Sequence, residues 1–156
     1  MSESRPIEGE FHASGARFAM VVARWNGEIT EKLLEGALRA LRRQDVADDD
    51  LQVYRVPGAF ELPLAARKVA ETGRFDAVIV LGAVIRGGTP HFDYVCAETT
   101  RGIGEVALAT GVPVAFGVLT TDDQEQARAR AGPGGDNKGE EAALTALEMV
   151  SLLRQL

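Results

Sequence analysis

The segment from Ile85 to His91, IRGGTPH, combines residue types that bind anions with one that transfers protons. Two adjacent glycines let backbone N–H groups approach a ligand closely, and Thr89 and Pro90 suit the N-cap and first position of a following helix. The free N–H groups and the positive helix end favour a phosphate. His91 is expected to be neutral in that first turn and is the best candidate for proton transfer. The alternatives are a glycine-rich turn without a ligand and a capping histidine.

Aromatic and polar side chains follow three other apolar runs. They are Trp25 and Asn26, then Ala59, Phe60 and Glu61, and further along the chain Phe116. The aromatic residues alone would usually belong to a core. Beside an amide and a carboxylate, however, they suit a flat heterocycle that stacks on rings while polar groups bind its edges. We therefore consider all six to be candidate substrate-binding residues.

Two cations, Arg130 and Lys138, flank the glycine-rich stretch from Gly132 to Gly135. Solvated charges are the default interpretation, but two cations beside a turn can also complete a phosphate pocket, even across a subunit boundary. Cys96 lies on the expected apolar face of its helix, which indicates an inert core thiol. Nothing resembles a Walker A loop or G-x-G-x-x-G, so neither a nucleoside triphosphate nor NAD is the expected ligand.

Hydrophobic periodicity predicts the elements that position these residues. Strands are expected at 18–23, 51–56, 76–82 and 112–119, and helices from Thr30, at 61–72, at 92–110, from a Thr121–Gln124 capping box to Arg130, and at 137–153. This alternation predicts an α/β fold, a flavodoxin-like three-layer αβα sandwich with a central parallel sheet. Ligands bind beyond the carboxyl ends of such strands, so the candidates converge on one rim. Residues 1–16 are expected to be a flexible arm outside the core, and residues 17–156 to be one domain.

Composition excludes several classes of function. The 17 Lys and Arg against 23 Asp and Glu give a formal charge of -6, which disfavours nucleic acid as a partner. No apolar stretch approaches the roughly 20 residues that cross a membrane. The N-terminus lacks the apolar segment of a secretory signal, so we expect a cytoplasmic protein. One cysteine and two histidines are too few for a zinc site, so no metal is expected.

Five segments resemble the lumazine synthase family, the third of them very specifically. They are RWNGEIT, VPGAFELP, LGAVIRGGTPHFDYVC, PVAFGVLTTDDQEQARARAG and DNKGEEAALTALEM, within a resemblance from about Arg17 to Leu153. The resemblance implies a 6,7-dimethyl-8-ribityllumazine synthase of riboflavin biosynthesis. This transferase condenses 5-amino-6-(D-ribitylamino)uracil with 3,4-dihydroxy-2-butanone 4-phosphate through an imine, releasing phosphate and water, without a metal or organic cofactor.

The resemblance also implies a role for each matching residue. Trp25 stacks on the pyrimidine, residues 59–61 hold the ribityl chain, the backbone of Ala83, Val84 and Ile85 binds the pyrimidine edge, Gly88, Thr89 and Arg130 bind phosphate, and His91 transfers protons. Phe116, Arg130 and Lys138 resemble groups that an adjacent subunit supplies. This implies a homo-oligomer with interfacial sites, a pentamer, while an icosahedral shell of pentamers and an association with riboflavin synthase stay open.

Trp25 departs from the family, because many members carry Phe there. We hypothesise that its larger face retains flavin-like product analogues more tightly. Two other functions stay open: a non-catalytic flavin- or phosphosugar-binding module, which would need no His91, and a shell-forming scaffold.

Overall fold

Four parallel strands form a sheet with the order β2-β1-β3-β4. The computed structural model describes residues 4–133 and 136–156. The strands are β1 (Phe18–Ala23), β2 (Leu51–Val56), β3 (Ala77–Ile85) and β4 (Val114–Thr121). All of β1 and the first seven residues of β3 are buried, because these two central strands are covered on both faces.

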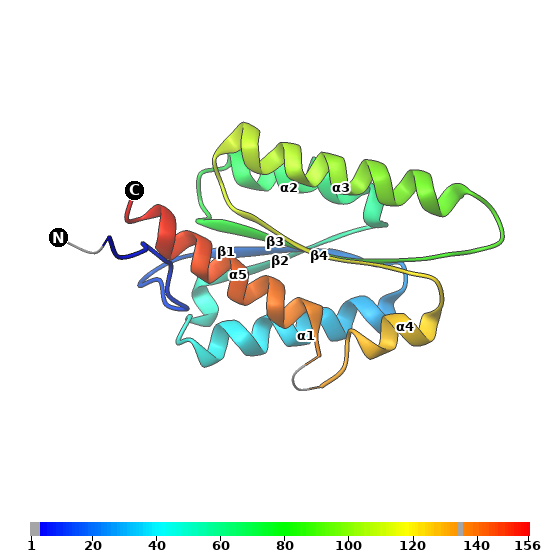
Figure 1. Cartoon of the computed structure of the whole chain (residues 1–156), viewed down its shortest axis with the longest axis horizontal. Helices are drawn as coiled ribbons and strands as arrows, with labels where there is room; N and C mark the ends of the chain where they lie inside the picture. Colours follow the sequence, from blue (N-terminus) through cyan, green and yellow to red (C-terminus); the bar gives the residue numbers. More distant parts are fainter. Residues whose placement is uncertain (1–3, 134–135) are drawn as a thin grey trace.

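Helices cover both faces of the sheet (Figure 1). One face carries α1 (Gly27–Arg43), α5 (Lys138–Leu153) and the short α4 (Gln124–Ala129); the other carries α2 (Leu62–Glu71) and α3 (His91–Thr110). Short 3₁₀ helices, η1 (Asp48–Asp50) and η2 (Ala59–Glu61), precede β2 and α2. Met20 and Ile79 belong to the core under α1 and α5, whereas Val21 and Val80 belong to the core under α2 and α3. The predicted α/β three-layer sandwich is confirmed.

The strand predictions are confirmed for β1 and β2 and differ at the ends of β3 and β4. Predicted to stop at residue 82, β3 continues to Ile85, because Val84 and Ile85 pair with Thr120 and Thr121. Predicted at 112–119, β4 lies two residues later. The sheet therefore extends further toward the rim than hydropathy indicated.

Three predicted helix starts are wrong. The first helix begins at Gly27 rather than Thr30. Thr121 ends β4, and α4 is instead capped by Asp123, whose side chain accepts a hydrogen bond from the Gln126 backbone N–H at 2.8 Å. Thr89 is not the N-cap of α3, because that position is occupied by Pro90, with no side-chain cap. The other predicted helix limits agree within one residue. Gly132 lies between α4 and α5 as predicted, whereas Gly134 and Gly135 fall outside the described residues.

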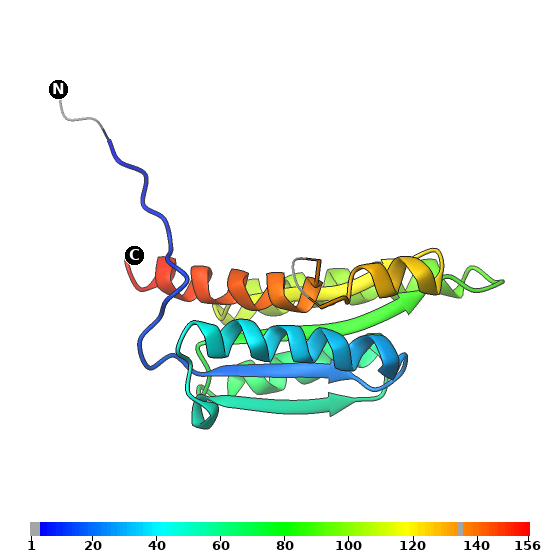
Figure 2. The ribbon, with the colours of Figure 1, turned by 90° about the horizontal axis from the view of Figure 1, so that it is seen from below.

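The N-terminal segment crosses the C-terminal end of α5, as Figure 2 shows. Glu10 donates its backbone N–H to Ser151 Oγ at 2.9 Å, and Gln155 Nε2 donates to the Glu8 carbonyl at 2.8 Å. Ala13 and Ala16 are buried in the core, so the expectation that all of residues 1–16 lie outside it is wrong for these two alanines. The boundary at residue 16 stays a prediction, and residues 1–3 fall outside the described residues.

In residues 4–133 and 136–156, no helix is both long enough and apolar enough to cross a membrane.

Candidate functional site

A cavity of about 510 Å³ opens at the carboxyl ends of β1 and β3; we call it the aromatic pocket. Its lining consists of Trp25, Asn26, Ala59, Phe60, Glu61, Ala83, Val84, Ile85, His91, Tyr94 and Val95. All of these except Tyr94 and Val95 are residues that the sequence predicted for the site. The convergence follows from the parallel sheet, which brings the ends of successive strands to one edge.

Three large aromatic side chains that line the aromatic pocket are exposed. Trp25 is 64%, Phe60 is 56% and Tyr94 is 73% accessible. The indole of Trp25 packs against the backbone of Gly58, where an added Cβ would overlap the ring. Because rings of this size are usually buried unless they bind something, the three exposed rings favour a flat, apolar ligand surface.

The amide and the carboxylate of the aromatic pocket are each anchored by one hydrogen bond. Asn26 Nδ2 donates to the Ala83 carbonyl at 2.9 Å, and Glu61 Oε2 accepts from the Gly58 backbone N–H at 3.0 Å. These bonds fix both groups at the rim. The Asn26 Oδ1 atom can then accept a ligand hydrogen bond, and the Glu61 carboxylate can accept from hydroxyl groups.

His91 is the exposed first residue of α3 and lines the aromatic pocket. Tyr94 and Val95 lie three and four residues further, on the same side of the helix. Sequence reasoning missed these two as lining residues, although their helical spacing from His91 was a usable signal. An imidazole beside exposed rings can exchange protons with a bound ligand.

Arg86, at the start of the predicted anion loop, binds neighbouring side chains of its own chain. Arg86 Nε lies 3.0 Å from Asp122 Oδ1, its Nη1 lies 3.5 Å from Asp93 Oδ1, and its guanidinium stacks 4.4 Å from the Phe92 ring centroid. Its charge is therefore already balanced by carboxylates. Gly88 and Thr89 are exposed. They line neither the aromatic pocket nor the second cavity, described below.

The other three predicted residues, Phe116, Arg130 and Lys138, line a separate cavity of about 470 Å³, which we call the cationic pocket. It lies along β4 and α5 and shares no lining residue with the aromatic pocket. Arg130 Nη1 donates to the Gln126 carbonyl at 3.0 Å, and Lys138 Nζ pairs with Glu141 at 2.8 Å. Phe116 is 45% exposed. The structure thus divides the predicted site between two places on one chain.

Cys96 is only partly buried and belongs to neither core cluster, so its predicted place in the core is wrong. Burial, followed by the charge of Asp93, raises the pKa of its thiol, so the protonated, unreactive form prevails near neutral pH, as the inert-thiol prediction requires. No group of three metal-ligating side chains is found among the residues that the structure describes.

Comparison with known proteins gives consistent results. The family model for 6,7-dimethyl-8-ribityllumazine synthase matches residues 15–154. A curated 6,7-dimethyl-8-ribityllumazine synthase of Chlorobium luteolum is 56% identical over 152 residues, covering 97% of this chain and 98% of that protein. A second, from Chlorobium phaeovibrioides, is 56% identical over 150 residues, with 96% and 97% covered.

Proposed function

The chain belongs to the 6,7-dimethyl-8-ribityllumazine synthase family, and we propose that its active site joins the aromatic pocket of one subunit to the cationic pocket of a neighbour. The enzyme is a condensing transferase of riboflavin biosynthesis. It condenses 5-amino-6-(D-ribitylamino)uracil with 3,4-dihydroxy-2-butanone 4-phosphate, releasing phosphate and water. The 56% identity to proteins that carry this name leaves the binding-module and scaffold alternatives without support.

One observation carries the proposal of a divided site. The phosphosugar substrate is an anion, yet the lining of the aromatic pocket contains neither Lys nor Arg among the described residues. The cationic pocket supplies both, Arg130 and Lys138, but through a different set of lining residues. A neighbouring subunit that presents Arg130 and Lys138 to the aromatic pocket would complete the charge balance of the bound substrates.

Within this site, each substrate is assigned its own groups. Trp25 stacks on the pyrimidine, whose edge binds Asn26 and the backbone of Ala83, Val84 and Ile85, while Ala59, Phe60 and Glu61 hold the ribityl chain. The neighbour's Phe116 and Lys138 complete the wall of the site. Gly88, Thr89 and the neighbour's Arg130 bind the phosphate.

The reaction begins when the 5-amino group of the pyrimidine attacks the ketone of the phosphosugar, and loss of water gives an imine. Phosphate is then eliminated, and the ribitylamino nitrogen closes the ring with loss of a second water. Holding the two reactants together contributes on the order of 7 to 11 kcal/mol. His91, which lines the aromatic pocket, moves the protons of these steps.

The assembly that we propose is a pentamer acting in the cytoplasm. The resemblance described above supports the pentamer. The cytoplasmic location is consistent with a single cysteine, which offers no intrachain disulfide. A shell of pentamers and an association with riboflavin synthase are extensions of this proposal. Sedimentation of the purified protein tests the shell, and sedimentation of its mixture with riboflavin synthase tests the association.

A complementation experiment tests the divided site. His91→Ala and Arg130→Ala chains, each impaired alone, are unfolded together, refolded as mixed oligomers and assayed at a limiting phosphosugar concentration. If the two residues come from different subunits, random mixing restores about one site in four, and the mixture exceeds the sum of its parents. If both residues act within one chain, every site keeps a defect and nothing is recovered. Arg130→Ala alone is expected to raise the KM for the phosphosugar.

A further inference from the structure

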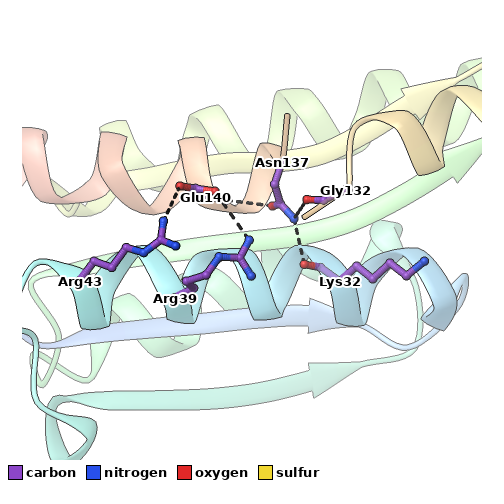
Figure 3. A network of polar contacts seen from close by, with 6 residues as sticks. All are labelled: Lys32, Arg39, Arg43, Gly132, Asn137 and Glu140. Carbon is purple, nitrogen blue, oxygen red and sulfur yellow. Dashed lines mark hydrogen bonds and ion pairs between the residues drawn. The ribbon is translucent and has the colours of Figure 1, made fainter. Parts of the chain in front are cut away.

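Asn137 is a polar residue buried at the junction of α1, α5 and the segment that joins α4 to α5. It is 2% exposed. Its Nδ2 donates to the Lys32 carbonyl at 3.1 Å and to the Gly132 carbonyl at 3.2 Å, and its Oδ1 accepts from the Glu140 backbone N–H at 3.0 Å. Figure 3 shows the side chain reaching from the start of α5 toward α1. The amide thus uses both its donor and its acceptor functions.

These bonds fix the backbone from which Arg130 and Lys138 extend. The Lys138 backbone N–H donates to the Arg130 carbonyl at 2.9 Å, and Ala131 forms an antiparallel bridge with Asn137. The two cations are therefore held side by side at the base of their connecting segment. That base is attached to α1 through the Asn137 amide and the Lys32 carbonyl.

The helices α1 and α5 pack closely around the Asn137 amide, which supports a role for Asn137 in fixing their relative position. A Cβ at Gly36 would overlap the Asn137 side chain, and a Cβ at Gly139 would overlap the Leu33 carbonyl. Alanine in a helix interior is favoured over glycine by about 1 kcal/mol, so Gly36, in the middle of α1, lowers helix stability. In return, α1 and α5 approach closely enough for Asn137 to reach the α1 backbone.

We propose that Asn137 is a positioning residue for the phosphate end of the active site, acting through Arg130 and Lys138. This inference rests on the proposed divided site, because it assumes that those two cations bind the phosphosugar. Without the amide donors, the carbonyls of Lys32 and Gly132 lose the bonds that tie the connecting segment to α1. The connecting segment then no longer holds the two cations at one place.

Asn137→Ser is the main test. Serine is neutral and can still cap α5, but it has no amide to donate to the two carbonyls. The KM for the phosphosugar is expected to rise about tenfold, as the loss of two hydrogen bonds allows. The KM for the pyrimidine substrate is expected to stay unchanged, because the aromatic pocket is not altered. Gly36→Ala, which displaces the Asn137 side chain without replacing it, is expected to act in the same direction.

Glu140→Gln is the matched control. It removes the Glu140 ion pairs with Arg39 at 3.7 Å and Arg43 at 3.6 Å, which join the same two helices (Figure 3), while the Asn137 bonds remain. It is expected to lower the melting temperature but to leave both KM values unchanged. If this control raises the phosphosugar KM as much as Asn137→Ser does, Asn137 contributes only to the general packing of α1 against α5. That result would overturn the proposal.

Comparison with Arg130→Ala separates the two levels of inference. If Arg130→Ala leaves the phosphosugar KM unchanged, the divided site itself is wrong. If Arg130→Ala raises that KM but Asn137→Ser and Gly36→Ala do not, only the role of Asn137 is wrong. Because Asn137 acts through Arg130 and Lys138, adding Asn137→Ser to Arg130→Ala is expected to raise the phosphosugar KM by less than the roughly tenfold rise in the parent protein; fully additive effects would contradict the proposal.

Discussion

The side-chain amide of Asn26 donates a hydrogen bond to the carbonyl oxygen of Ala83 at 2.9 Å, joining the ends of β1 and β3. Asn26 has a φ of 61°, a left-handed conformation that Asn adopts more readily than most residues. The chain turns here from β1 into α1, which directs Trp25 into the aromatic pocket. One residue therefore holds the strand end, the turn and the stacking surface together.

Two replacements of Asn26 separate the energetic contribution of its hydrogen bond from the cost of its left-handed backbone conformation. Asn26→Gly removes only the hydrogen bond, so the free energy of unfolding is expected to fall by about 1 kcal/mol. Asn26→Ala also incurs the left-handed penalty, so the fall is expected to be about 2 to 3 kcal/mol. Urea denaturation at one protein concentration measures both. Equal losses for the two variants would show that the conformation carries no cost.

His91→Ala is expected to lower kcat by about 10²- to 10⁴-fold, the usual contribution of a positioned acid or base. Activity above the uncatalysed rate is expected to remain, because the site still holds the two substrates together. Absorbance of the lumazine product at saturating substrates measures the effect. His12→Ala provides the control, since His12 is exposed in the N-terminal segment, and its kcat should match that of the parent protein. An undiminished kcat for His91→Ala would remove His91 from the chemistry.

Trp25→Phe is expected to weaken riboflavin binding. The indole is 64% exposed in the aromatic pocket and offers more stacking area than a phenyl ring. A loss of about 1 kcal/mol, or roughly fivefold in Kd, is the size of such aromatic contacts. Quenching of riboflavin fluorescence in a titration measures the Kd. The same affinity in both proteins would eliminate the hypothesis that Trp25 retains flavin-like ligands.

The pair Glu28–Arg128 is expected to make stability depend on pH. Glu28 accepts hydrogen bonds from Arg128 at 2.8 Å and from Gln124 at 3.0 Å, joining α1 to α4. The bond from Arg128, then the Arg128 charge, lowers the pKa of Glu28 below its ordinary value of 4.5. A carboxyl group whose pKa is lowered in the folded state stabilises the protein at pH values above its ordinary pKa of 4.5. This stabilisation disappears as the pH falls through the lowered pKa.

The melting temperature of Glu28→Gln should therefore lie below that of the parent protein at neutral pH, and the gap should narrow as the pH falls below 4.5. Because the pair is exposed, added salt should narrow the gap as well. Glu125→Gln on α4 is the matched control, since Glu125 has no ion pair within residues 4–133 and 136–156. A gap that grows toward low pH would contradict the direction of the pKa shift.

The limits of a strand could be predicted from the sequence where they depend only on the strand's own residues. The run Phe18–Ala23 is apolar throughout and ends at Arg24, so its limits coincide with β1. Thr120 and Thr121 look polar, yet they belong to β4 because they pair with Val84 and Ile85. Such pairing depends on a partner more than thirty residues away, which local hydropathy does not contain.

The N-cap residue of α4 could not be identified from the sequence for a similar reason. Thr121 and Asp123 are both good N-cap residues, and only tertiary context distinguishes them. In the structure, Thr121 Oγ1 donates to the Asp123 carbonyl at 2.9 Å, which leaves the Asp123 side chain to cap α4.

The composition of the aromatic pocket could be predicted from the sequence because parallel strands end at a common edge. The separation of Phe116, Arg130 and Lys138 from that pocket could not be derived from spacing. Phe116 lies within β4, and Arg130 and Lys138 flank the segment between α4 and α5, so the positions of the strand ends do not locate these three residues. The distances that divide them depend on how α4 and α5 pack beside β4.

The presence of two unlike pockets on every chain constrains the symmetry of any assembly that joins them. In a ring of three or more chains such a contact is heterologous, since it runs from head to tail in a single rotational direction. A twofold pair would complete its sites only if both pockets lay at the shared interface, each facing the other pocket of the partner, and an open row of chains would leave half a site unpaired at each end. Only a closed assembly makes the number of complete sites equal to the number of chains, so turnover per chain becomes a measure of closure.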